Sequence, residues 1–158
     1  MIRLANKGDL DDINKLLFQV HKVHSDARPD LFKAGAKKYN DKELLEIIND
    51  EKRPIFVCVD NGVIIGYAFC IFKDNKNIPS LCDYTSIYID DLCVDEKYRG
   101  KGIGKDLYEF VVDFARKSGC YNVTLNVWAD NKNAVKFYEK LGMRIQKIGM
   151  EVILEENE

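Results

Sequence analysis

The chain has 158 residues, with 24 basic and 26 acidic side chains and a formal net charge of −2. A hydrophobic share of 46% and this length fit one globular domain over residues 1–158 and exclude disorder for most of the chain. The near-neutral charge leaves no broad basic surface for a nucleic-acid backbone, and no apolar run approaches the ~20 residues of a membrane-spanning helix. The polar N-terminus is unlike a signal peptide, so we expect a cytoplasmic protein without nucleic-acid or membrane partners.

The cysteines and histidines do not form a metal-binding pattern. The five cysteines are an odd number without a C-x-x-C pair, which indicates buried thiols in a reducing compartment rather than a disulfide framework. His21 and His24 are spaced i, i+3 on an expected helix, but no third ligand accompanies them. We therefore predict that no metal is bound.

The hydrophobic pattern and the turn residues divide the chain into alternating elements. The Asp60-Asn61-Gly62 segment between two β-branched runs is the strongest short hairpin signal. In chain order, the expected elements are a strand at 2–4, a helix at 8–26, helical starts after Pro29 and Asn40, strands at 55–59, 63–72 and 84–94, a helix at 103–117, a strand at 122–127, a helix at 131–141 and a final strand at 143–154. An antiparallel meander followed by a β-α-β unit predicts a mixed sheet of the α+β class.

A glycine-rich loop lies between the expected strand 84–94 and the helix that begins near Ile103. Gly100, Gly102 and Gly104 allow the backbone to turn tightly and to direct several N–H groups at one anion, and the helix dipole reinforces them. The spacing excludes the dinucleotide fingerprint G-x-G-x-x-G, because position 105 is Lys105, and it is one residue too short for the P-loop. The pattern that fits is R-x-x-G-x-G, beginning at Arg99.

This loop resembles the pyrophosphate loop, Q/R-x-x-G-x-G/A, of the GNAT superfamily of acetyl-coenzyme A-dependent N-acetyltransferases. Residues 91–104 match that loop and the strand that leads into it. Residues 131–143 are similar to the family's N-x-x-A-x-x-F-Y-E-K-x-G-F segment, with Met143 in place of the usual aromatic residue. The resemblance implies the family's fold, a central mixed and mostly antiparallel sheet with helices on both faces.

The same resemblance implies that acetyl-coenzyme A is the cosubstrate. Strand residues would offer backbone groups to the pantetheine arm, as an added strand would. Lys101 and Lys105 are equally compatible with solvated lysines at a helix start. The expected cofactor-binding residues are Leu92, Cys93, Val94, Arg99, Gly100, Lys101, Gly102, Ile103, Gly104, Lys105, Asn131, Ala134 and Phe137.

The family's reaction is direct attack of a neutral amine on the acetyl thioester. By resemblance, Tyr138 is the expected general acid for the departing thiolate, since a phenol has a pKa of ~10; the alternative is a packed aromatic residue beside Phe137. Asp90 is the expected base, directly or through a water, and a backbone N–H beside a bulge within 92–94 is the expected oxyanion donor. Successive strand residues face opposite sides, so Asp90 and Asp91 share a cleft only if a bulge intervenes.

The amine acceptor is the part of the function with the weakest sequence signal. We expect His24, Arg28 and Asp91 to contact it, and the acidic residues Asp83, Asp90 and Asp91 favour a cationic amine. Arg28 would instead suit an acceptor with a carboxylate. Three functions stay open: acetylation of a small-molecule or peptide amine, acetylation of protein N-termini or lysines, and coenzyme A sensing without catalysis, by a monomer or a homodimer.

Overall fold

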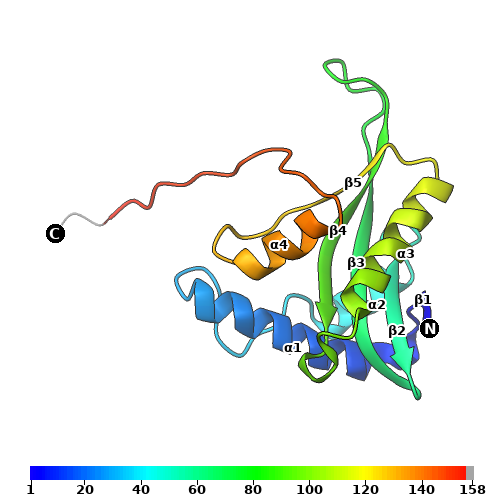
Figure 1. Cartoon of the computed structure of the whole chain (residues 1–158), viewed down its shortest axis with the longest axis vertical. Helices are drawn as coiled ribbons and strands as arrows, with labels where there is room; N and C mark the ends of the chain where they lie inside the picture. Colours follow the sequence, from blue (N-terminus) through cyan, green and yellow to red (C-terminus); the bar gives the residue numbers. More distant parts are fainter. Residues whose placement is uncertain (156–158) are drawn as a thin grey trace. The chain divides into compact units, whose positions relative to one another are not determined.

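The computed structural model describes residues 1–155 and divides into two units, Met1–Asn126 and a second unit that begins at Val127. The first unit contains one five-stranded sheet with the order β1-β2-β3-β4-β5 (Figure 1). Neighbouring strands are antiparallel except for the parallel pair β4 and β5. The strands are β1 (Ile2–Leu4), β2 (Ile55–Asp60), β3 (Val63–Asp74), β4 (Thr85–Val94) and β5 (Asn122–Leu125). The expected mixed, mostly antiparallel sheet is confirmed.

The β2–β3 connection is the hairpin that Asn61-Gly62 predicts. Asp60 pairs with Val63, and the two residues between them have positive φ values of 49° and 77°. Two successive positive φ angles define the type I′ turn, whose twist matches that of the flanking strands.

Three helices of the first unit cover the two faces of this sheet. α1 (Leu10–Ala27) and α2 (Asp41–Ile48) bury Ile13, Leu17 and Leu44 against Val57. The adjacent strand residue, Phe56, packs against Phe110 and Phe114 of α3 (Ile103–Lys117), with ring centroids 4.9 and 5.0 Å apart. Because neighbouring strand residues point to opposite faces, α3 lies on the face opposite α1 and α2. Helices on both faces are therefore confirmed.

The ends of these helices follow from local chemistry. Before α1, the short 3-10 turn Lys7–Asp9 has a capping box between Asn6 and Asp9, and Asn40 with Glu43 forms a second box at α2.

The helical start expected after Pro29 is wrong. The N–H groups of Leu31 and Phe32 both bond to the carbonyl of Arg28, so the chain makes one turn and does not continue as a helix.

The second unit contains α4 (Lys132–Lys140), which ends before Gly142, a residue with φ of +100°. The strand expected at 143–154 is wrong, because within the described part of this unit residues 143–155 form no regular secondary structure. Ile148 and Met150 are 75% and 92% exposed. Apolar residues alone do not make a strand, since a strand also requires a neighbouring backbone with which to exchange hydrogen bonds.

No helix in residues 1–155 combines the length and apolar character that a bilayer crossing requires.

Candidate active site

β4 and β5 lie side by side over only part of their length. Their pairing extends from Ser86 opposite Asn122 to Ile89 opposite Leu125, where β5 ends. β4 continues to Val94, and among residues 1–155 no strand pairs with this second half of β4 on its β5 side. An unpaired strand edge presents main-chain N–H and C=O groups that an extended ligand can bind.

The bulge expected within 92–94 is wrong, because these residues pair in regular register with β3, and the β-bulge lies instead at Asp90, where the unpaired half begins. Phe69 of β3 pairs with Asp91 and Cys70 pairs with Ile89, so Asp90 is an extra residue in β4. A bulge interrupts the alternation of side chains. Asp90 and Asp91 consequently both reach tyrosines on the face that α1 and α2 cover, and the condition for both carboxylates to share one site is met.

The Asp91 carboxylate is held by a buried tyrosine. The hydroxyl of Tyr67 donates to Oδ2 of Asp91 at 2.6 Å. Desolvation raises the pKa of Asp91 to about 6, although the Tyr67 hydrogen bond and the charge of Lys38 lower it. A carboxylate whose pKa lies near neutrality is better matched to general-base work than an ordinary aspartate.

The Asp90 carboxylate has two partners from the segment that joins α1 to α2. The hydroxyl of Tyr39 donates to Oδ2 at 2.5 Å, and Nζ of Lys38 lies 2.9 Å from Oδ1. Burial and the hydrogen bond to Asp90 raise the pKa of Tyr39, so its phenol stays protonated and acts as a donor. Two side chains that adjoin in sequence therefore fix one carboxylate at the bulge.

Aromatic packing connects the two tyrosine–aspartate pairs. The ring of Phe69 stacks on Tyr39 at 5.7 Å and meets Tyr67 edge to face at 4.8 Å. Sequence reasoning missed Lys38, Tyr39 and Tyr67. The alternation of Tyr67 with Phe69 places them on one face of a strand, but no local pattern links Tyr39 to a residue 51 positions further along the chain.

The glycine loop precedes α3 as expected. Gly100 and Gly102 have φ angles of +79° and +82°, which L side chains rarely adopt. The carbonyl of Gly102 accepts the hydrogen bond from the Asp106 N–H at 3.0 Å, which places Gly102 at the cap of α3. Among residues 1–155, no atom would lie within 4 Å of a Cβ added at Gly102, its chain neighbours and its own helix backbone aside. Glycine is required there by backbone conformation, and the open space lies where a helix N-terminus favours an anion.

Basic side chains surround this loop without a strong acidic partner. Nε of Arg99 donates to the carbonyl of Val94 at 3.2 Å, and Nζ of Lys101 lies 5.2 Å from the ring centre of Tyr98. Lys105 forms an exposed pair with Glu109 at 3.9 Å. An exposed pair of this kind is weak, so Lys105 can turn towards a phosphate at little cost.

In the strand before the loop, the Cys93 side chain faces away from the unpaired edge. Its Sγ donates to the carbonyl of Leu16 in α1 at 3.7 Å, and burial raises the pKa of the thiol to about 12. The thiol is therefore no nucleophile, and only the main chain of Cys93 is available to a coenzyme.

The expectation of buried thiols is wrong for Cys82, which is exposed in the β3–β4 loop.

The second block lies around α4 in the second unit. The side chain of Asn131 accepts a hydrogen bond from the Ala134 N–H at 3.2 Å and caps the helix. The rings of Phe137 and Tyr138 pack edge to face at 5.0 Å. The roles of these four residues towards a coenzyme stay predictions.

Residues expected near the acceptor, His24 on α1, Arg28 at its end and Asp83 before β4, have other partners. His24 stacks on Phe32 with ring centroids 5.2 Å apart, and desolvation lowers its pKa. Arg28 binds Asp30 through two hydrogen bonds of 2.8 and 3.0 Å. Asp83 lies in the β3–β4 loop, where its carboxylate accepts from Asn77 N–H, and not on the strand with Asp90.

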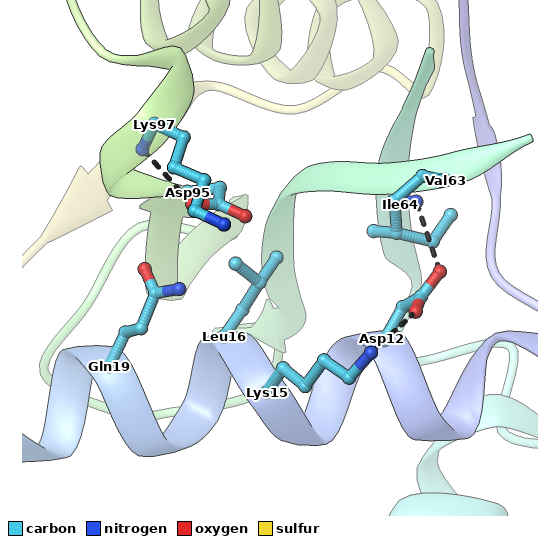
Figure 2. A pocket seen from close by; sticks show the side chains of 8 residues that line it. All are labelled: Asp12, Lys15, Leu16, Gln19, Val63, Ile64, Asp95 and Lys97. Atoms are coloured by element: carbon cyan, nitrogen blue, oxygen red, sulfur yellow. Dashed lines mark hydrogen bonds and ion pairs between the residues drawn. The ribbon is translucent and has the colours of Figure 1, made fainter. Parts of the chain in front are cut away.

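A separate pocket of about 320 Å³ lies between α1, the start of β3 and the segment after β4 (Figure 2). Asp12 in this pocket accepts from the Ile64 N–H at 3.1 Å, and Lys15 lies 3.9 Å from Asp12. The residues that line this pocket do not include Asp90 or Asp91.

In the part of the chain that the structure describes, no group of three His, Cys, Asp or Glu residues is placed to hold a metal ion.

The comparisons with known proteins agree with this architecture. The model of the acetyltransferase (GNAT) family matches residues 19–143, so the chain belongs to the GNAT family of acetyltransferases. The structure of a mutant of the BH1408 protein from Bacillus halodurans is similar, with a TM-score of 0.93, 32% identity and coverage of 98% of this chain and 99% of that one.

Two curated relatives show how far the similarity extends. The chain is 29% identical over 147 residues to an uncharacterized N-acetyltransferase of Methanocaldococcus jannaschii, a match that covers 93% of this chain but only 62% of that protein. It is 30% identical over 152 residues to thialysine N-epsilon-acetyltransferase of Bos taurus, covering 90% of this chain and 82% of the relative.

Proposed function

We propose that this protein transfers the acetyl group of acetyl-coenzyme A to a primary amine that carries positive charge. The observation that carries the proposal is the order of features on β4: the bulge with Asp90 and Asp91, the unpaired backbone of 92–94, and the glycine loop before α3. One strand thus provides an acidic site for the amine, an edge for an extended ligand and a loop for an anion.

The cofactor would lie along this edge. The main chain of Leu92, Cys93 and Val94 would bond the pantetheine arm, and the loop 99–105 would bind the pyrophosphate through its N–H groups and basic side chains. A backbone N–H beside the bulge would stabilise the developing oxyanion, because a fixed donor needs no reorganisation as charge appears.

An ammonium acceptor must lose two protons, one before and one after it attacks the thioester, and the departing thiolate must gain one. Asp90, with Asp91 beside it, would take the proton from the ammonium group, directly or through a water. The neutral nitrogen then bonds to the acetyl carbon, the C–S bond breaks with its electron pair staying on sulfur, and the nitrogen loses its second proton to solvent to give the amide. Tyr138 would give its phenolic proton to this thiolate and recover one from solvent. The raised pKa of Asp91 supports an acceptor role for the pair.

Charge supports a cationic acceptor. Two adjacent carboxylates attract an ammonium group and raise its local concentration. The Bos taurus relative is named for acetylation of the ε-amine of thialysine, which is also a primary amine. Acetylation of a protein N-terminus or lysine uses the same chemistry, and we keep it as the second candidate.

A thiol-release assay with acetyl-coenzyme A over a panel of amines tests the proposal. The panel includes a polyamine, an aminoglycoside, a free amino acid, a lysine peptide and an anionic amine. We expect the highest kcat/KM for a cationic acceptor and an acceptor KM that increases with salt, because salt screens the attraction. If calorimetry detects coenzyme binding but acetyl-coenzyme A releases no thiol with any amine of the panel, the protein is instead a coenzyme A sensor. A preference for anionic amines would contradict the cationic site.

A further inference from the structure

The ammonium group of Lys38 occupies a small site that is built for a primary amine. Its Nζ lies 2.9 Å from Oδ1 of Asp90 and 3.4 Å from the main-chain carbonyl oxygen of the same residue. It also lies 5.6 Å from the centre of the Tyr39 ring. A carboxylate oxygen, a carbonyl oxygen and an aromatic face are three groups that together recognise an alkylammonium ion.

The neighbouring lysine shows that this placement is particular to Lys38. Nζ of Lys37 donates at 2.6 Å both to Asp41 in α2 and to the side chain of Asn14 in α1. Lys37 therefore contributes positive charge nearby without contact to Asp90. It provides a matched control for any experiment on Lys38.

Breaking the ion pair costs the more exposed ammonium of Lys38 less free energy than it costs the partly buried carboxylate of Asp90. The side chain of Lys38 is 43% exposed, whereas that of Asp90 is only 13% exposed. The departing ammonium regains water, but the remaining carboxylate lies beside Asp91 in a partly buried position and favours another cation. Lys38 also lies in residues 28–40, which form no regular helix or strand that would hold it.

We propose that Lys38 is an internal substitute for the acceptor: its ammonium fills the site of the acceptor's primary ammonium at Asp90 and is displaced when a cationic amine binds. This inference rests on the proposed function and deepens it, because it makes Lys38 a specificity-determining residue. The exchange replaces one cation by another, so the charge at Asp90 and Asp91 is conserved. An anionic or neutral group cannot make this exchange.

Thermal unfolding of the free protein tests the site without any catalysis. In Lys38→Ala, the melting temperature should be lower than in the wild type and should rise by about 2–5 °C with saturating n-butylammonium. Tetramethylammonium has the same charge but no N–H donor, and it should give a smaller rise. The wild type and Lys37→Ala, in which Lys38 fills the site, should respond weakly. Equal responses of all three proteins to n-butylammonium would overturn the proposal.

Steady-state kinetics provide the second test. Lys38→Met keeps most of the aliphatic chain over Tyr39 and removes the charge, so this variant is available if the alanine variant does not fold. We expect its KM for a cationic amine to fall on the order of fivefold, because no partly exposed ion pair has to be broken. The coenzyme KM and the kinetics of Lys37→Met should not change. An unchanged or higher amine KM would show that Lys38 does not compete with the acceptor.

The two tests separate this inference from the proposed function. Rescue of Lys38→Ala by n-butylammonium in a protein that releases no thiol would support the ammonium site and reject the acetyl transfer. Thiol release with neither rescue nor a KM change would support the acetyl transfer and reject the role of Lys38.

Discussion

The hydroxyl of Tyr67 lies 2.6 Å from Oδ2 of Asp91, and this hydrogen bond joins the middle of β3 to the bulged part of β4. Desolvation raises the pKa of Asp91, and the Tyr67 hydrogen bond opposes that shift. The balance keeps the carboxylate ionised at neutral pH but close to protonation. Asp91 can therefore take a proton and release it again at moderate cost.

This raised pKa makes the stability of the protein depend on pH. Asp91 has a pKa of about 6 in the folded chain and 3.8 as its ordinary value, so the folded state binds more protons between pH 4 and 6. Its contribution to stability is fully present below pH 4 and is lost as pH rises through 6. Relative to Asp91→Asn, the wild type should lose roughly 2–3 kcal/mol across this window.

Urea unfolding at several pH values between 4 and 7.5 measures this difference. Asp60→Asn, at the exposed end of β2, is the control and should follow the wild type. Parallel pH profiles for Asp91→Asn and the wild type would show that the carboxylate is not desolvated.

Tyr138→Phe should lower turnover by roughly 10²-fold and leave coenzyme affinity nearly unchanged, because it removes a proton donor and keeps the ring that packs on Phe137. Steady-state rates and calorimetric titration with coenzyme A measure the two quantities. Phe137→Leu serves as a control for loss of packing. If Tyr138→Phe turns over at the wild-type rate, water or another group supplies the proton.

Gly102→Ala should weaken coenzyme binding at least tenfold. The new methyl group would occupy the open space at the cap of α3, and φ of +82° is strained for alanine. Gly149→Ala is the control, because Gly149 has no positive φ and no close neighbour in the described part of the chain. Calorimetry with acetyl-coenzyme A measures affinity, and circular dichroism checks that α3 is intact. Wild-type affinity in a folded Gly102→Ala protein would remove the loop from the coenzyme site.

Gly66→Ala should destabilise the fold by about 1–3 kcal/mol, as overpacking of a tight contact does. A Cβ at Gly66 would lie 3.0 Å from Cδ1 of Leu107 and 3.1 Å from the Cys93 carbonyl oxygen. The latter atom belongs to the backbone and cannot move aside as a side chain can. The double variant with Leu107→Val relieves only the first contact and should recover part of the loss in chemical denaturation. A neutral effect of Gly66→Ala would mean that β3 and β4 separate easily.

Local sequence signals were sufficient for most of the fold. The Asn61-Gly62 turn, the Asn40 cap and the apolar periodicity of α1 and α3 each act over a few residues, and each appears where expected. The glycine loop is a signal of the same kind, since positive φ at Gly100 and Gly102 is a local requirement. The resemblance to one family came from two such local blocks.

The sequence by itself determined most of the elements, the fold class and the glycine loop, because these depend on residues close together in the chain. Only the tertiary structure decided the surroundings of the acidic pair. The bulge at Asp90 depends on the register between β3 and β4, and the partners Tyr39 and Lys38 reach it from the connection between α1 and α2. The missing strand at 143–154 follows the same rule, since an apolar run becomes a strand only when tertiary structure brings another edge beside it.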